Sequence, residues 1–305
     1  MKPKLVIVLG PTAVGKSERA LDLALQFGAE IISADSQQVY RYMDIGTAKA
    51  SREQRERIPH HLIDVVNPDE EFNAAIYRNL ATEIAYKLSD RGKRIIVCGG
   101  TGLYIKALTK GLFAAPGGDP QIRQALEWEL EEHGTDSLYH RLEQVDPESA
   151  ARIHPNDRQR IGRALEVYHA TGQRISDWQR EHGFNDLLFE VLKVGLERQR
   201  GELYDRIDRR CEFMIQSGLL DEVNNLVGMG FGLDLKAMQS VGYRHMGLFL
   251  KDRMSLDNAV YLMKRDTRRL AKRQLTWFHS DREIRWCDPE GQRGDVEDAV
   301  RKFFD

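Results

Sequence analysis

The chain contains little cysteine and no long apolar stretch. Its three cysteines, Cys98, Cys211 and Cys287, lie far apart and form no C-x-x-C pair. This spacing supports neither a disulfide framework nor a zinc site, and it is typical of a protein of the reducing cytosol. No apolar run reaches the roughly 18 residues that a membrane span needs, and a strand pattern begins as early as Lys4. We therefore expect a cytoplasmic protein with neither a signal peptide nor a membrane segment.

An excess of charge of either sign is also lacking. Charged residues make up 30% of the chain, hydrophobic residues 41%, and the net charge is -2. These values describe an ordinary globular protein, so the bulk charge identifies no class of partner. A length of 305 residues is enough for one large core and a smaller second domain. We expect two lobes and a monomer.

Short apolar runs recur through the first third of the chain and predict the strands of a sheet. They cover Lys4–Leu9, 30–33, 61–66 and 94–98, and helical patterns separate at least some of them. Alternation of buried strands and helices is typical of a parallel sheet covered by helices. We expect residues 1–116 to form the first part of an α/β core that resembles the P-loop NTPases.

The middle of the chain has a different pattern. Pro116, Gly117 and Gly118 interrupt it, and residues 117–187 contain amphipathic helical patterns without a convincing strand. The clearest helix should begin with Asn156 as its N-cap and end near Gly172. We expect a smaller, all-helical insertion domain.

The sheet pattern then resumes. Residues 190–196 are typical of a further strand, helices are expected from about residue 199 to residue 279, and a short terminal segment follows at 284–287. Residues 188–305 should therefore form the second part of the core.

A glycine-rich loop follows the first predicted strand and matches the pattern G-x-x-x-x-G-K-[ST]. In such a loop backbone N–H groups surround phosphate oxygens, Lys16 supplies a positive charge, and Ser17 can bind Mg²⁺. The position between a buried strand and a helix start predicts a site for a diphosphate or triphosphate with magnesium. The loop consists of Gly10, Pro11, Thr12, Ala13, Val14, Gly15, Lys16 and Ser17.

Asp35 follows the second predicted strand. The carboxyl ends of parallel strands lie at one edge of the sheet, so this carboxylate should lie near the phosphates. From its position alone Asp35 could bind magnesium, act as a general base, or cap a turn. The adjacent His60 and His61 should point to opposite faces of a strand, which favours a structural role over a shared metal.

Six short blocks follow one another along nearly the whole chain. They are GPTAVGKS at 10–17, DSQQVY at 35–40, IGTAK at 45–49, PHHLID at 59–64, GGTGLY at 99–104 and SVGYR at 240–244. In this order they resemble the bacterial tRNA dimethylallyltransferases.

The resemblance implies a reaction. Members of the family transfer a dimethylallyl group from dimethylallyl diphosphate to N6 of adenosine 37 in the tRNA anticodon loop, which gives N6-isopentenyladenosine. The phosphate loop would then hold the leaving diphosphate, Asp35 would be the base, and Lys16 and Thr101 would take part in catalysis. An arginine of the segment 205–209 should also bind the diphosphate, and the sequence leaves open whether this is Arg206 or Arg209.

Basic patches point to an RNA partner. Lys264, Arg265, Arg268, Arg269, Lys272 and Arg273 recur at helical spacing and should share one helix face. Residues 158–163 provide a second basic patch. The resemblance implies that the tRNA is contacted by Asp35, Ser36, Gln37, Gln38, Thr101, Arg123, Gln159, Arg160, Ile161, Gly162, Arg163, Ser240, Val241, Gly242, Tyr243, Arg244, His245, Arg269, Lys272 and Arg273.

Three other functions remain open at this point. In a small-molecule kinase ATP would occupy the loop and Asp35 would activate a hydroxyl group. An adenylate isopentenyltransferase would modify a free nucleotide instead of tRNA. A nucleotide-gated RNA-binding switch would perform no chemistry.

Overall fold

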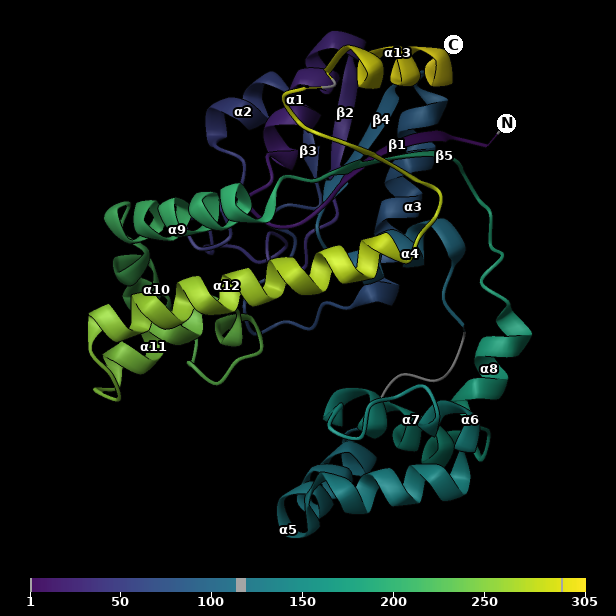
Figure 1. Cartoon of the computed structure of the whole chain (residues 1–305), viewed down its shortest axis with the longest axis vertical. Coiled ribbons are helices and arrows are strands. Elements are labelled where there is room, and N and C mark those ends of the chain that lie inside the picture. Colours follow the sequence, from purple (N-terminus) through teal and green to yellow (C-terminus); the bar gives the residue numbers. More distant parts are fainter. Residues whose placement is uncertain (1, 114–118, 292) are drawn as a thin grey trace. The chain divides into compact units, whose positions relative to one another are not determined.

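The computed structural model describes residues 2–113, 119–291 and 293–305, so the interruption expected at 116–118 lies outside the described residues. The chain divides into two compact units, a larger one of Met1–Thr109 and Leu187–Asp305 and a smaller one of Lys110–Asp186 (Figure 1). The first boundary lies several residues before the expected 116, and the second lies one residue before the expected 187. None of the helices in the described part of the chain combines the length and the apolar character that a membrane span requires.

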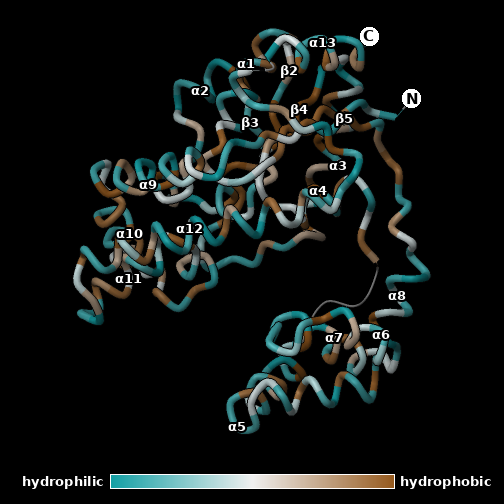
Figure 2. The backbone as a smooth tube through the Cα atoms, in the orientation of Figure 1, coloured by the Kyte–Doolittle hydropathy of each residue, from teal (hydrophilic) through white to brown (hydrophobic). Residues whose placement is uncertain are grey.

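A six-stranded sheet forms the centre of the larger unit. Its strand order is β3-β2-β4-β1-β5-β6, and every neighbouring pair is parallel. This confirms the predicted α/β fold with a parallel sheet. Figure 2 shows hydrophobic stretches along the central strands. The strands are β1 (Lys4–Leu9), β2 (Ala29–Ser33), β3 (His60–His61), β4 (Arg94–Gly99), β5 (Glu190–Leu196) and β6 (Ile284–Cys287).

Helices pack against this sheet. The first helix packs against β1, β2 and β4, and the last packs against β1 and β5. The last helix follows β6 and was not expected from the sequence. The helices that begin in this unit are α1 (Lys16–Phe27), α2 (Arg52–Arg57), α3 (Ala74–Asp90), α4 (Gly102–Lys110), α9 (Arg200–Gln216), α10 (Leu219–Gly228), the 3-10 helix η1 (Ala237–Gln239), α11 (Tyr243–Leu250), α12 (Leu256–His279) and α13 (Arg293–Phe304).

Helices are the only regular elements among the described residues of the smaller unit, which has its own apolar core with Leu142 and Leu165 fully buried. The N-cap of α7 is Asp157 and not the predicted Asn156, because the Asp157 carboxylate accepts a hydrogen bond from the amide of Arg160 at 3.1 Å. Its helices are α5 (Pro120–Val145), α6 (Pro147–Ala150), α7 (Arg158–Thr171) and α8 (Ile175–His182).

The strand predicted over residues 61–66 is wrong for most of its length. Only His60–His61 pairs with β2, because Leu62 and Asp64 adopt positive φ angles of 61° and 57° that turn the backbone out of the sheet. The Asp64 carboxylate then lies 2.6 Å from Nζ of the buried Lys49. The apolar residues of this segment follow a pattern typical of a strand, but the polar contacts of Asp64 stabilise a loop.

Candidate active site

The glycine-rich loop joins β1 to α1 in the conformation that its glycines allow. Gly10 and Gly15 have φ angles of 145° and 109°, and a Cβ atom on Gly10 would lie 2.5 Å from the carbonyl oxygen of Leu196. Only glycine fits there without displacing the neighbouring strand. Lys16 follows as the first residue of α1, and its ammonium group donates to the carbonyl of Pro11 at 2.6 Å.

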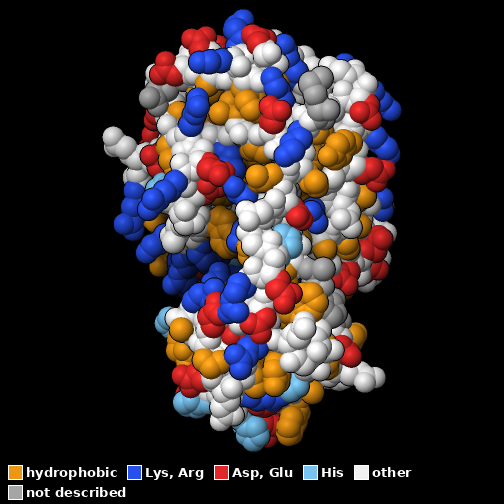
Figure 3. Space-filling view, turned by 90° about the vertical axis from the view of Figure 1, so that its right-hand side faces the viewer, with side chains coloured by type: hydrophobic (Ala, Val, Ile, Leu, Met, Phe, Trp, Pro, Cys, Tyr) orange, Lys and Arg blue, Asp and Glu red, His pale blue; other side chains and the backbone are white. Residues whose placement is uncertain are grey.

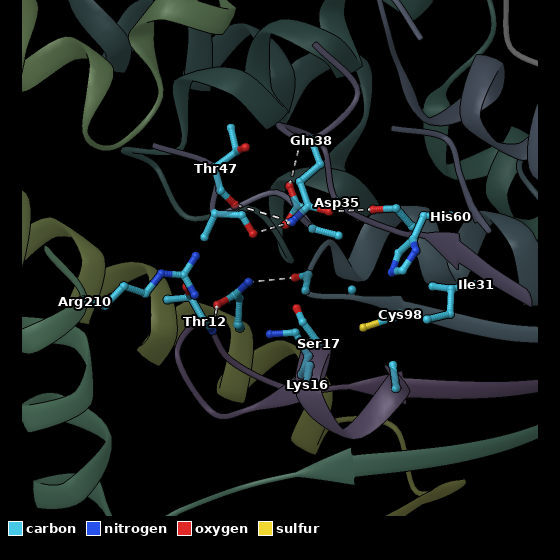
Figure 4. A pocket seen from close by; sticks show the side chains of 17 residues that line it. Thr12, Lys16, Ser17, Ile31, Asp35, Gln38, Thr47, His60, Cys98 and Arg210 are labelled. Atoms are coloured by element: carbon cyan, nitrogen blue, oxygen red, sulfur yellow. Dashed lines mark hydrogen bonds between the residues drawn. The ribbon is translucent and has the colours of Figure 1, made fainter. Parts of the chain in front are cut away.

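A pocket opens beside this loop, where β1, β2 and β4 end (Figure 4). This is the sheet edge at which ligands of parallel α/β folds bind. In Figure 4 Arg210 and His60 enter the pocket from opposite sides. The polar and sulfur-containing side chains that line the pocket belong to Thr12, Lys16, Ser17, Ser33, Asp35, Gln38, Thr47, His60, Cys98, Arg210 and Gln274.

Asp35 lies in the loop after β2 and is held there by its neighbours. Its Oδ1 accepts the amides of Gln37 at 2.8 Å and Gln38 at 3.3 Å. The amide of Ser36 donates to Oγ1 of Thr101 at 3.0 Å, which fastens this loop to the one after β4. The structure thus brings Asp35 into the pocket with the phosphate loop, while Thr101 supports the loop that carries Asp35.

Three of the arginines of α9 lie in different surroundings. Arg206 donates from Nε to the carbonyl of Ala13 at 2.9 Å, against the phosphate loop. Arg209 is exposed and donates to the carbonyl of Asp205. Arg210 was missed by the sequence reasoning, although it lines the pocket. Its spacing of four residues from Arg206 is a signal that could have found it, because such residues share a helix face.

Burial shapes the charges of the pocket. It lowers the pKa of Lys16 to about 8, an effect that the carboxylate of Asp35 partly offsets. Burial also lowers the pKa of Arg210 and raises that of the Cys98 thiol to about 11. Removing water from two cations is unfavourable unless an anion compensates. The pocket therefore favours a ligand with several negative charges.

The six cations of α12 divide into two groups. Lys264 contacts Glu212 at 2.5 Å and Arg268 binds Asp208, so both are paired with carboxylates of α9. The other column comprises Arg265, Arg269 and Arg273, with Lys272 beside it; of these four, Arg269, Lys272 and Arg273 are exposed. Figure 3 shows one face of the molecule, with Lys and Arg side chains gathered along its left side.

A buried carboxylate organises part of this basic surface. Asp266 accepts hydrogen bonds from Arg244, from Arg265 at 3.0 Å and from Arg269 at 3.4 Å, and His245 lies 3.2 Å away. Burial alone would raise the pKa of this carboxyl, but the hydrogen bonds outweigh burial and hold it at about 2. Asp266 therefore remains charged and fixes the arginines around it.

The smaller unit contains a similar arrangement. Glu166 is buried and accepts hydrogen bonds from Arg123 at 3.2 Å and Arg163 at 2.8 Å, so it brings together two of the residues expected to contact tRNA. Gln159 and Arg160 are exposed, Gly162 is half-buried, and Ile161 is buried in the core of this unit.

The segment 240–245 is mostly turned inward. Tyr243, Gly242 and His245 are buried, while Ser240, Val241 and Arg244 are half-buried. The hydroxyl of Tyr243 donates to Glu222 at 2.5 Å, and the same carboxylate accepts the amides of residues 44–46 at 2.8–3.2 Å. Glu222 thus ties this segment to a loop that reaches the pocket at Thr47.

The two adjacent histidines do not share a site. His60 lines the pocket and its Nδ1 lies 2.7 Å from the carbonyl of Ile58, whereas His61 contacts Glu30 at 2.7 Å. Among the described residues no three of His, Cys, Asp and Glu are grouped in a way that could hold a metal by themselves.

Comparison with known proteins agrees with this geometry. The sequence profile described as IPP transferase matches residues 38–281, more than half of the chain. This chain belongs to the IPP transferase family. A tRNA dimethylallyltransferase of Syntrophobacter fumaroxidans is 52% identical over 301 residues, which cover 99% of this chain and 88% of that relative. The resemblance seen in the six sequence blocks is therefore confirmed.

Solved structures of the IPP transferase family also match this fold. The tRNA isopentenylpyrophosphate transferase of Bacillus halodurans has a TM-score of 0.73 and 36% identity, and the match covers 99% of this chain and 97% of that one. A eukaryotic dimethylallyltransferase acting on tRNA has a TM-score of 0.81 and 29% identity over 98% of this chain and 77% of that one.

Proposed function

We propose that this protein transfers a dimethylallyl group from dimethylallyl diphosphate to N6 of adenosine 37 in the anticodon loop of tRNA. The observation that carries the proposal is the pocket of a chain that belongs to the IPP transferase family. It combines a phosphate loop, the half-buried cations Lys16 and Arg210, and a carboxylate held by its own loop. These are the groups that displacement of a diphosphate by a weak nucleophile requires.

Each group has a part in the transfer. The N6 nitrogen forms a bond to C1 of the allyl group, while the bond from C1 to oxygen breaks and its electron pair leaves with the diphosphate. Lys16, Arg210 and the N–H groups of the loop stabilise this departing charge. The adenine nitrogen loses its proton to Asp35, which is half-buried in the same pocket.

Magnesium fits this donor set. Mg²⁺ prefers oxygen ligands and is usually bound by one or two protein oxygens together with phosphates and water. Ser17 and Asp35 offer such oxygens in the pocket, and we propose that Ser17 binds the ion. When bound, the ion would neutralise part of the diphosphate charge.

We propose that the RNA lies against exposed basic and amide side chains. Arg269, Lys272 and Arg273 on α12 and Gln159 and Arg160 on α7 can reach an RNA backbone from the surface. The buried members of the same blocks would act indirectly, by holding their neighbours. Adenosine 37 must leave the base stack to reach Asp35, and a single-stranded anticodon loop permits this at the lowest cost.

Mass spectrometry of the RNA product tests the function. The purified protein is incubated with Mg²⁺, dimethylallyl diphosphate and an anticodon stem-loop carrying A36-A37-A38. We expect the RNA to gain one C5H8 unit at A37, and free AMP or ADP to remain unmodified. An unchanged RNA combined with phosphate transfer from ATP to a metabolite would instead establish the kinase.

We also propose that the protein acts as a monomer in the cytoplasm. The three cysteines of the chain are free thiols, as is usual for proteins of reducing compartments. Light scattering of the purified protein, with and without RNA, measures the oligomeric state.

A further inference from the structure

Gln274 of α12 lines the pocket, and both the oxygen and the nitrogen of its side-chain amide form hydrogen bonds there. Its Oε1 accepts the backbone N–H of Thr12 at 2.8 Å, and its Nε2 donates to the carbonyl of Gly100 at 2.9 Å. A Cβ atom on Gly100 would lie 2.4 Å from Nε2, so this approach depends on glycine. The side chain therefore bridges two loops that follow different strands.

The Gln274 side chain contacts the two loops that are proposed to hold the leaving group and the base. Thr12 belongs to the phosphate loop, where the leaving group is expected. Gly100 precedes Thr101, whose hydroxyl accepts the amide of Ser36 next to Asp35. A single side chain thus connects the loop for the leaving group to the loop that carries the proposed base.

We propose that Gln274 is a positioning residue that sets the distance between the phosphate loop and the loop of Asp35. The inference rests on the proposed transferase function. Reaction rates are sensitive to such alignment, because a displacement of about 1 Å can cost about 10²-fold. Gln274 also lies on the helix whose exposed Arg269, Lys272 and Arg273 are proposed to meet the RNA.

The hydrogen-bond pattern requires an amide at this position. Thr12 offers a donor and Gly100 offers an acceptor, so the bridging side chain must accept with one atom and donate with the other. In Gln274→Ala both loop groups lose their partner. In Gln274→Glu the near-isosteric carboxylate can still accept from Thr12, but its second oxygen faces the Gly100 carbonyl. Protonation of that carboxylate would restore a donor.

Single-turnover transfer to the anticodon stem-loop tests this assignment. We expect Gln274→Ala and Gln274→Glu to lower the rate constant for transfer by about 10- to 100-fold, with Kd for the RNA within about twofold of wild type. The control is Thr276→Ala on the same helix, an exposed residue whose hydroxyl bonds only to the carbonyl of Lys272 among the described contacts. It should transfer at the wild-type rate.

A pH series separates positioning from loss of structure. The rate of Gln274→Glu, divided by the wild-type rate at the same pH, should rise as pH falls from 8 to 5, because the introduced carboxyl gains its proton as the pH approaches the usual pKa of glutamate, about 4.3. The same ratio for Gln274→Ala should stay flat, because alanine has nothing to protonate. A destabilised fold would lower both ratios alike and would appear in thermal denaturation.

The outcomes distinguish this inference from the proposed function. Wild-type transfer combined with an unchanged rate in both variants overturns the role of Gln274 alone, as does a flat ratio for Gln274→Glu. A change confined to Kd for the RNA would make Gln274 a binding residue and also overturn it. Absence of product with wild-type protein would instead count against the transferase function.

Discussion

The pocket and the basic surfaces use positive charge in opposite ways. On the surfaces, buried carboxylates fix the arginines in advance, Asp266 in the larger unit and Glu166 in the smaller one. In the pocket, burial lowers the pKa of Lys16 and Arg210, and among the described lining residues the carboxylate beside them belongs to Asp35. The surface charges are thus positioned for a large polyanion, whereas the pocket charges gain most from a small one that displaces water.

This contrast predicts different consequences of mutation. Loss of a pocket group should reduce the rate or the binding of diphosphate, because each group acts at short range in a partly buried site where solvent screens charge less. Loss of a surface cation should weaken RNA binding modestly and in a salt-dependent way, because solvent screens it.

The largest effect should come from the carboxylate of the pocket. Asp35→Asn keeps the shape of the side chain and removes its ability to accept a proton. We expect the rate constant for transfer to fall by about 10²- to 10⁴-fold, with RNA affinity nearly unchanged. Rapid-quench kinetics at saturating RNA measure the rate, and fluorescence anisotropy measures the affinity. A variant with the wild-type rate would exclude Asp35 as the base.

Arg210→Ala should produce the next largest effect. It removes a cation that lines the pocket, and we expect the affinity for dimethylallyl diphosphate to fall by about 30-fold, equivalent to about 2 kcal/mol. Arg209→Ala is the matched control, because Arg209 is exposed on the same helix. Isothermal titration with diphosphate compares the two, and equal losses would contradict the assignment of Arg210 to the pocket.

The titration of Lys16 predicts how diphosphate affinity changes with pH. Its pKa is about 8 in the free protein because burial disfavours the charged form. A bound anion favours that form and raises the pKa, so binding takes up a proton above pH 8. The affinity should be constant just below pH 8 and fall by up to about tenfold per pH unit above it.

Lys16→Arg is the control for that titration. Arginine keeps its charge beyond pH 12, so the decline above pH 8 should disappear even where the absolute affinity differs. A decline of equal steepness in both proteins would assign the titration to another group.

The smallest effects should distinguish the two groups of cations on α12. Lys272→Ala should weaken RNA binding about equally for different RNA sequences and reduce the salt slope by about one. Lys264→Ala should leave the slope unchanged, because Lys264 is paired with Glu212. Filter binding between 50 and 200 mM salt, as in comparable protein–nucleic acid titrations, measures both slopes.

Local patterns account for much of what could be predicted. The phosphate loop followed from glycine spacing between an apolar run and a helix start, and β5 followed from its apolar run, whereas residues 284–287 were expected only as a short terminal segment. The prediction of a strand over residues 61–66 was wrong because the backbone conformation there depends on the contact between Asp64 and Lys49, which forms only in the folded chain. The predicted N-cap of α7, Asn156, lies one residue before the observed one, Asp157, because both polar residues are of a type that can cap a helix.

The order of the blocks, the class of the fold and the chemistry of the loop could be inferred from the amino-acid sequence, because these depend on residue type and short spacing. The three-dimensional structure was needed to show which arginine of α9 lines the pocket, which cations of α12 are paired with carboxylates, and that Gln274 bridges Thr12 and Gly100. Those facts depend on contacts between residues far apart in the chain, and such contacts are fixed by packing and not by any local pattern.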